Sequence, residues 1–139
     1  SGPALEYAKA VEAELNQLVF PALRSLLAAK PPKNREVRVD GRPLDLGGVV
    51  PHQTLGAIRN LLEHEPVVQA GLRTQFPHDH AWLLGVLPRE LRRLAEFRNA
   101  GAHAGVTDAA ELAEVRRGVL GVGQEGLLGR VVRVGMRGR

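Results

Sequence analysis

The residues best suited to chemistry form the short segment Arg-Asn-Ala-Gly-Ala-His at positions 98–103. Histidine, with a reference pKa of about 6.5, can give or take a proton near neutral pH. The planar guanidinium of arginine can hold a phosphate and stabilise charge on its oxygens. A glycine-containing turn after Asn99 could fold the chain back and bring Arg98, Asn99 and His103 to one corner of the molecule. Together these residue types suit chemistry on a phosphodiester.

An amphipathic helix leads into this segment. Leu87, Leu91 and Leu94 follow one another at steps of four and three residues, which predicts a single apolar face. Four residues further along the same face comes Arg98, and an arginine there is costly to bury without a partner. A purely structural explanation stays open, because a basic residue in the last turn and an Asn or Gly beyond it are common at helix ends.

Apolar periodicity predicts a long first helix over residues 4–29, which Pro21 should kink. A short β-hairpin follows, because alternating apolar residues lead into Asp40-Gly41, a favoured tight-turn pair. Pro43 limits the return strand to an edge position. We expect this hairpin to be an insertion between the first two helices.

The rest of the chain is predicted to be helices separated by proline and glycine. These segments are, in order, a helix that begins at Thr54 as N-cap, residues 67–75, residues 80–99 divided at Pro88, and residues 107–120. Residues 127–134 form a short extra helix or strand. Apolar stripes on helices joined by modest loops bury one another, so the predicted fold is all-α: an antiparallel four-helix bundle with a small hairpin insertion.

Length and composition limit the classes of protein that this chain can represent. With 139 residues, 44% of them hydrophobic, it is predicted to be a single globular domain over residues 1–139. The absence of cysteine excludes disulfides and thiolate metal sites and fits a reducing cytosol. No apolar run approaches the roughly 20 residues that span a bilayer, so we expect a cytoplasmic protein. Residues 1–3 look like a cloning scar, which predicts that the chain was cut from a larger protein.

The segment at 98–103 resembles the R-N-x-x-x-H form of the R-x4-6-H motif of the HEPN superfamily. These are small helical-bundle domains, often RNA-cutting, of toxin–antitoxin, CRISPR-associated and other defence systems. In that family the motif lies where the third core helix gives way to the fourth, which is its predicted place here. The opening residues 5–11 also resemble the family's first helix. The resemblance covers most of the chain in architecture but only six residues in specific motif.

The loose pattern also occurs elsewhere in the chain: from Arg59 to His64, from Arg73 to His78 and from Arg73 to His80. The first of these is predicted to lie within a continuous helix without a glycine turn. The other two are interrupted by Phe76-Pro77 and lack the asparagine. Only the match at residues 98–103 combines a helix end, a polar second residue and a turn.

The resemblance implies a metal-independent RNA endonuclease without cofactors, in which a ribose 2′-hydroxyl attacks and a cyclic phosphate is left. His103 would be general acid or base, Arg98 would hold the scissile phosphate and Asn99 would orient one of them. A homodimer is implied because the family's sites form where two motifs face each other. The residues expected to bind RNA are Arg92, Arg93, Arg130 and Arg133.

Two alternatives stay open beside the nuclease. One is a non-catalytic HEPN-type module that dimerises or binds a partner protein or nucleotide within a larger regulatory protein. The other is a nucleic-acid binder that uses the C-terminal arginines at 130, 133, 137 and 139, although these could equally be a solvated basic tail of a chain with net charge +4.

The cluster His78-Asp79-His80 could bind a metal only on an extended segment and with His52 or His64 as a further ligand. The simpler explanation is a helix N-terminus with Asp79 as its cap, so we expect no metal site. Trp82 is predicted to belong to the core rather than to a surface that stacks on bases.

Overall fold

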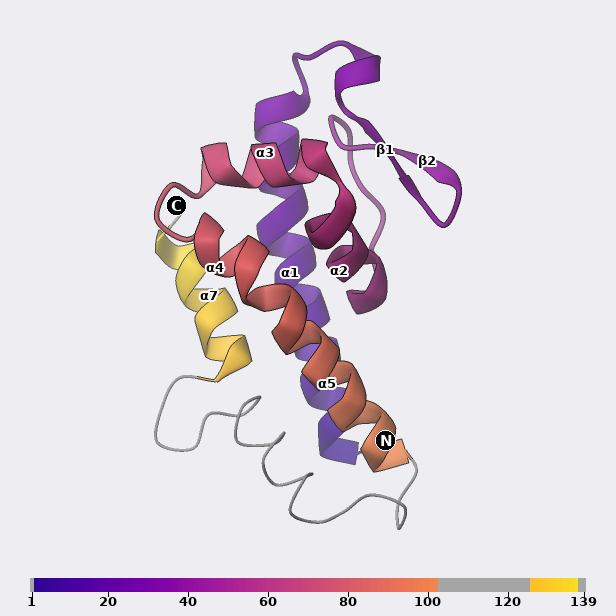
Figure 1. The fold of residues 1–139 in the computed structure, drawn as a ribbon, viewed down its shortest axis with the longest axis vertical. Coiled ribbons are helices and arrows are strands. Elements are labelled where there is room, and N and C mark those ends of the chain that lie inside the picture. The colour runs from indigo at the N-terminus through magenta and orange to yellow at the C-terminus, as the bar shows by residue number, and fades with distance from the viewer. Residues whose placement is uncertain (1, 103–125, 138–139) are drawn as a thin grey trace.

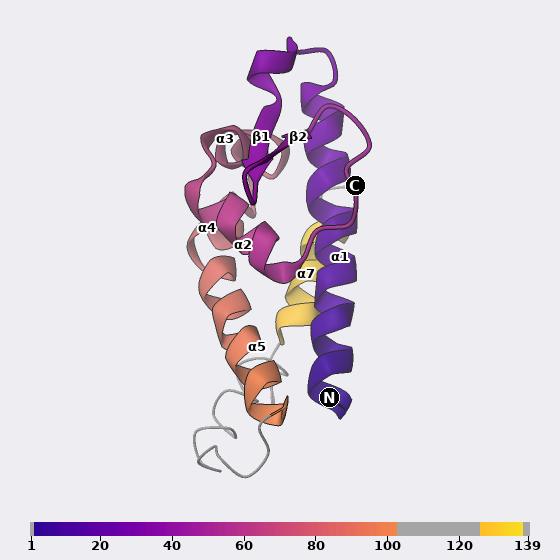
Figure 2. The ribbon, with the colours of Figure 1, turned by 90° about the vertical axis from the view of Figure 1, so that its right-hand side faces the viewer.

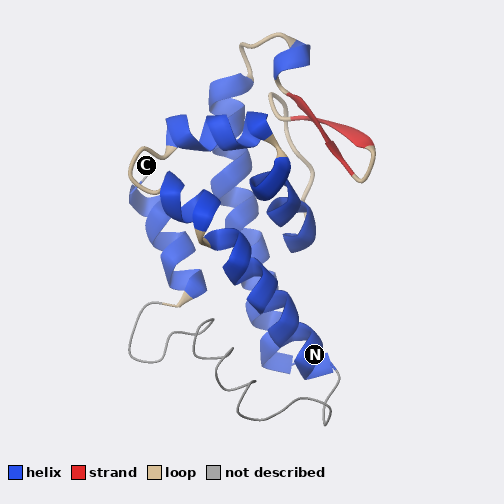
Figure 3. Cartoon of the chain, viewed as in Figure 1, coloured by secondary structure: helices blue, strands red, loops and turns tan. Residues whose placement is uncertain are grey.

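The computed structural model describes residues 2–102 and 126–137 (Figure 1). This part is mainly helical, with one two-stranded hairpin (Figure 3). The elements are α1 (Gly2–Leu27), a 3-10 turn (Pro32–Asn34), β1 (Glu36–Val39), β2 (Arg42–Asp45), α2 (Leu55–His64), α3 (Pro66–Gln75), α4 (His80–Gly85), α5 (Leu87–Ala102) and α7 (Leu127–Arg137). The helix predicted over residues 107–120 lies outside the described residues.

The long helix α1 is the element against which α3, α5 and α7 pack. Figure 2 shows α1 along one side of the molecule, with α5 and the short helices α2 to α4 along the other. The predicted first helix is confirmed, although it ends at Leu27 rather than at residue 29. Pro21 lies within α1 without ending it, on the exposed side. The buried side chains of α1 recur at helical spacing and include Ala8, Val11, Leu15, Val19, Leu23 and Leu27.

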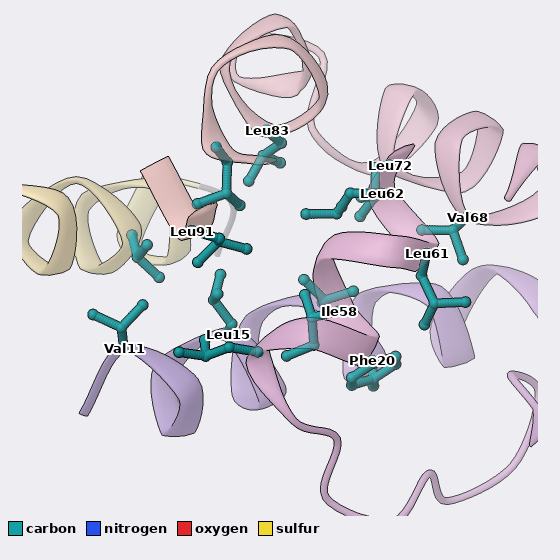
Figure 4. Close-up of a cluster of buried hydrophobic side chains, with 14 of the residues drawn as sticks. Val11, Leu15, Phe20, Ile58, Leu61, Leu62, Val68, Leu72, Leu83 and Leu91 are labelled. Carbon is teal, nitrogen blue, oxygen red and sulfur yellow. The ribbon is translucent and has the colours of Figure 1, made fainter. Parts of the chain in front are cut away.

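The hydrophobic core lies between α1 and the helices packed on it; α7 contributes Leu127, Val131 and Val134, and Figure 4 shows mainly the part formed with α2 to α5. The close-up shows side chains of α1, among them Leu15 and Phe20, facing side chains from those helices: Ile58, Leu61, Leu62, Val68, Leu72, Leu83 and Leu91. Burying one such large apolar side chain contributes roughly 1.5–3 kcal/mol. The core therefore fixes the positions of α2 to α5 relative to α1.

The predicted hairpin is confirmed by the pairing of β1 with β2, whose last pair is Val39 with Arg42. Asp40 and Gly41 have φ angles of +53° and +75°, and two consecutive positive φ angles are what the tight type I′ turn requires. Pro43 lies in β2, and both strands of a two-stranded sheet are edges that tolerate proline.

The helices after the hairpin begin at the residues from which they were predicted to begin. The hydroxyl of Thr54 accepts a hydrogen bond from the backbone N–H of Ala57 at 3.1 Å and so caps α2. Pro66 is the first residue of α3, and Pro88 is the second residue of α5, which confirms the division of residues 80–99. The C-terminal segment is a helix, α7, rather than a strand.

A mainly helical fold is thus confirmed, with the hairpin as the one sheet in the described residues. The lengths of the helices are unequal, since α1 has 26 residues and α5 has 16, whereas α2 and α3 have 10 each and α4 has 6. The antiparallel four-helix bundle stays a prediction. Within the described ranges, no helix combines the length and apolar character needed to cross a bilayer.

Candidate functional site

Arg98 and Asn99 lie in the last two turns of α5, which continues to Ala102. The expectation that the helix ends at Asn99 is therefore wrong. A single glycine inside a helix costs about 1 kcal/mol relative to alanine, and here two alanines, the best helix formers, flank Gly101. His103 lies outside the described residues, so the structure places two of the three predicted catalytic residues.

The apolar face of α5 ends at Phe97 rather than at Arg98. Leu91 and Leu94 are buried, Phe97 is 9% exposed, and Arg98 is half-buried. The phenylalanine takes the next core position, and the arginine lies at the border between core and solvent. Such a position suits an arginine whose stem packs on apolar surface while its guanidinium reaches water. Asn99, next to it, is exposed.

Two of the predicted RNA-binding residues, Arg92 and Arg93, are exposed on the same helix. Arg92 pairs with Glu63 of α2, with Nη2 3.1 Å from Oε1, and Arg93 Nη1 lies 3.9 Å from Oε1 of Glu90. Exposed pairs of this kind contribute at most about 1 kcal/mol. Along the helix axis these arginines lie roughly 8–9 Å from Arg98. A bound phosphate chain could therefore compete for both guanidinium groups.

The other two, Arg130 and Arg133, lie on α7, and Arg130 takes part in the packing of that helix. Its guanidinium lies 5.1 Å from the centroid of the Trp82 ring, and its Nη2 is 3.6 Å from Oδ1 of Asp79. Arg137, two turns further on, places Nη2 3.0 Å from the same oxygen. The idea of a solvated basic tail is therefore wrong for Arg130, whereas Arg133 and Arg137 are exposed, Arg137 with its guanidinium paired to Asp79. Residue 139 lies outside the described part.

The carboxylate at the centre of this cluster is buried: the Asp79 side chain is 4% exposed. Asp79 holds the N-cap position of α4, as predicted, but its side chain makes no capping hydrogen bond. The neighbouring ring of His80 bonds through Nδ1 to the carbonyl of Phe76 at 3.0 Å. No group of three potential metal ligands occurs among the residues that the structure describes. Trp82 is half-buried against the core, as predicted.

The sequence did not point to the Asp79 cluster as a structural link between α4 and α7. A usable pattern existed, because Arg130 and Arg137 are seven residues apart in a segment with apolar residues at helical spacing. Two arginines on one face, together with a single acidic residue between histidines, would have suggested an ion pair.

A second polar cluster, also missed, ties the loop before α2 to α1. The carboxylate of Glu12 accepts a hydrogen bond from the backbone N–H of Leu55 at 3.0 Å, and its other oxygen lies 2.7 Å from Nε2 of His52. The Asn16 side chain both accepts from and donates to the backbone of Gln53. These contacts satisfy backbone groups of the loop and hold the N-terminus of α2 in place.

The competing match from Arg59 to His64 lies inside α2, as predicted. Its histidine Nε2 is 3.5 Å from Oε2 of Glu63, the same glutamate that pairs with Arg92. Arg73 lies in α3, which ends at Gln75 before the two histidines that follow it. The Arg73 matches are thus interrupted, as predicted, whereas the helical setting of Arg59 to His64 does not separate it from residues 98–102, which are also helical.

Tyr7 joins the first turns of α1 to the start of α7. Its hydroxyl accepts a hydrogen bond from the backbone N–H of Leu128 at 2.9 Å. Burial raises the pKa of Tyr7 above its ordinary value of 10.0, and this hydrogen bond opposes the rise. The hydroxyl stays neutral at physiological pH. Its hydrogen bond satisfies a backbone N–H in the first turn of α7 and so caps that helix.

No protein-family model, curated protein or solved structure matches the chain. A function for this chain can therefore be inferred only from its own residues, above all from the motif at residues 98–103.

Proposed function

We propose that this protein is a HEPN-like, metal-independent RNA endonuclease of a prokaryotic defence or toxin system. The observation that carries the proposal is the half-buried Arg98 near the end of α5, with exposed Asn99 beside it and His103 five residues further on. The proposal includes a four-helix bundle in which the segment predicted over residues 107–120 is the last core helix. It also includes a homodimer, in which the motifs of two copies form one site.

In the proposed reaction the 2′-oxygen of a ribose attacks the adjacent phosphorus while the bond from phosphorus to the 5′-oxygen breaks. The products are a 2′,3′-cyclic phosphate and a free 5′-hydroxyl, and no water is consumed. His103 takes the proton of the 2′-hydroxyl or gives one to the leaving oxygen, a role worth about 10²–10⁴ in rate. Arg98 binds the non-bridging oxygens, on which negative charge grows. Asn99 orients one of these two groups.

The exposed arginines of α5 are the best candidates to hold the RNA beside the scissile phosphate. Arg92 and Arg93 have only exposed ion pairs to give up, and Arg133 is exposed on α7. Arg130 would contribute less, because its guanidinium already lies between Trp82 and Asp79. Each phosphate contact of this kind adds about one unit to the salt dependence of binding.

The test is cleavage of a mixed RNA pool by the purified chain in the presence of EDTA. His103→Ala and Arg98→Ala should each lower the rate at least about 100-fold. The chain provides a matched control, since Arg59→Ala and His64→Ala alter the same sequence pattern within α2 and should leave cleavage unchanged. The products should carry cyclic phosphate ends, and an RNA with 2′-deoxy sugars should resist. A wild-type chain that leaves all RNAs intact, or a His103→Ala variant that cuts at the normal rate, contradicts the proposal.

The second candidate is a non-catalytic module that binds a partner protein within a larger regulatory protein. It is favoured by large apolar side chains at the surface, since Val49 is 80% exposed and Met136 69% exposed. Val132 and Met136 lie one turn apart on α7 and line the same groove, and an exposed apolar patch of this kind often marks a site where another protein binds. This candidate predicts that alanine at Arg98 or His103 leaves the function unchanged, whereas a charge introduced at Met136 abolishes it.

A further inference from the structure

The hairpin has two outer edges, because its sheet consists of two strands in the described part of the chain. Figure 1 shows the hairpin beside α2, reaching out from the helices. The outer edge of a strand presents a row of backbone N–H and C=O groups with which another extended chain can pair. The two edges of this hairpin differ in how far those groups are available.

The register of the hairpin determines which residues turn their backbone groups outward. The last pair before the two-residue turn exchanges hydrogen bonds, and such hydrogen-bonded pairs recur at every second residue. The bond from the N–H of Leu46 to the carbonyl of Arg35, at 2.9 Å, agrees with this alternation. The backbone N–H and C=O groups of Glu36 and Arg38 therefore point away from β2.

The edge of β2 is blocked. Its outward groups belong to Pro43 and Asp45, and proline has no N–H to donate. The carbonyl of Asp45 accepts a hydrogen bond from the N–H of Gly48 at 3.3 Å, and its carboxylate accepts one from the N–H of Gly47 at 2.8 Å. A proline and a turn of this kind are common ways in which proteins protect a sheet edge.

The edge of β1 is open. Glu36 and Arg38 are both exposed, and their outward backbone groups make no hydrogen bond to any residue in 2–102 or 126–137. These groups recur every two residues, or about 7 Å, a spacing that another extended backbone matches. A groove of about 250 Å³ between β1 and α2, lined by Arg38 and Gly56 among others, leaves room for such a chain to continue past Arg38.

The exposed face of β1 carries two opposite charges, two residues apart. Glu36 lies directly opposite Asp45, and like charges in this arrangement destabilise a sheet. Asp45 is paired with Arg35 at 3.0 Å, whereas Glu36 forms no ion pair with another described residue. Arg38 donates from Nη1 to the carbonyl of Gly41. A third strand with a basic residue beside Glu36 and an acidic residue beside Arg38 would complement both charges.

We propose that β1 binds an extended segment of a partner protein, which becomes the third strand of the sheet. The segment runs antiparallel to β1, the direction that is more stable per residue. It carries an acidic residue opposite Arg38 and, two residues later, a basic residue opposite Glu36. Backbone hydrogen bonds supply the attraction and the two charges supply the selectivity. The proposal does not depend on the nuclease, because it uses none of Arg98, Asn99 and His103.

A peptide titration tests the proposal, followed by the amide NMR signals of the ¹⁵N-labelled 139-residue chain. The probe is the peptide Thr-Thr-Glu-Val-Lys-Thr-Thr with blocked ends, and the control is the same peptide with Glu and Lys exchanged. The signals of Glu36 and Arg38 should move and saturate, whereas those of Val37 and Val39, already bonded to β2, should move less. The control peptide should bind at least about fivefold more weakly, because two attractive pairs become repulsive.

Two variants separate the contribution of the charges from that of the backbone. A chain with both Glu36→Arg and Arg38→Glu should reverse the preference between the two peptides, because only the charges are exchanged. Arg38→Pro removes an outward N–H and keeps the bonds to β2, so it should weaken binding of both peptides about tenfold or more. Arg42→Ala removes a positive charge at an exposed position of β2 and should change nothing. An unchanged Val37 signal shows that the hairpin is intact in each variant.

Three results would overturn the proposal. The first is that neither peptide moves the signals of Glu36 and Arg38 at about 10 mM. The second is that the two peptides bind equally well, since the charges would then select nothing. The third is that the same signals move with protein concentration alone, because a second copy of this chain would then occupy the edge in place of a partner protein.

Discussion

Replacing Asp79 with asparagine removes the charge that holds α7 against α4. The Asp79 side chain is 4% exposed, and its Oδ1 lies 3.0 Å from Nη2 of Arg137 and 3.6 Å from Nη2 of Arg130. Removing one partner of a buried ion pair costs about 3–5 kcal/mol when the other charge cannot reach water. Here the two arginines are 27% and 42% exposed and can turn toward solvent. We therefore expect the free energy of unfolding to fall by about 2–3 kcal/mol.

The matched control is Asp45→Asn. Its carboxylate lies at the same distance, 3.0 Å, from Nε of Arg35, but the aspartate side chain is 50% exposed, so the loss should be at most about 1 kcal/mol. Urea unfolding followed by circular dichroism measures both values. In the Asp79→Asn background, Arg137→Ala should add little, because the pair is already broken. A cost for Asp79→Asn no larger than that for Asp45→Asn would refute the argument from burial.

Two further stability predictions use the same urea assay. Gly71→Ala should lower the free energy of unfolding by about 1–3 kcal/mol, because the new Cβ would lie 2.5 Å from Cδ2 of Leu23. Gly56→Ala, whose Cβ would meet nothing within 4 Å, should raise the free energy of unfolding by about 0.5–1 kcal/mol. Equal effects of the two variants would contradict this prediction. Burial raises the pKa of Tyr7 in the folded state, so its contribution to stability is complete below pH 10.0 and is lost as the pH rises through the folded value. Tyr7→Phe should remove this alkaline loss but cost about 1 kcal/mol at neutral pH by leaving Leu128 N–H without its acceptor, and a variant with an unchanged alkaline profile would argue against burial as the cause.

Features set by local chemistry could be predicted from the sequence. The turn at Asp40-Gly41 requires positive φ angles that these residue types tolerate, and the cap at Thr54 needs only a side-chain oxygen within three residues of an N–H. The division of the third helical region at Pro88 follows from the missing N–H of proline. Each depends on contacts within a few residues, so nothing distant in the chain can overrule it.

Features set by tertiary packing could not be predicted in this way. Apolar residues at steps of three and four would permit either Phe97 or Arg98 to take the last core position of α5. Which of the two is buried depends on the direction in which α1 crosses α5, and the structure buries Phe97. The partners of Asp79 lie more than fifty residues away in sequence. The end of α5 also differs from the predicted one, because the cost of one glycine is smaller than what the surrounding helix contributes.

The structure changes how the positive charge of this chain should be interpreted. A net charge of +4 treats all arginines as equally available to an anionic partner. Two of them, Arg130 and Arg137, share the buried carboxylate of Asp79, so their charge holds α7 in place and is partly neutralised. Arg92 and Arg93 are themselves exposed, and each makes one ion pair with a half-buried glutamate. Any affinity of the described part for nucleic acid should therefore depend on α5 far more than on α7, next to the half-buried Arg98 where the proposed chemistry takes place.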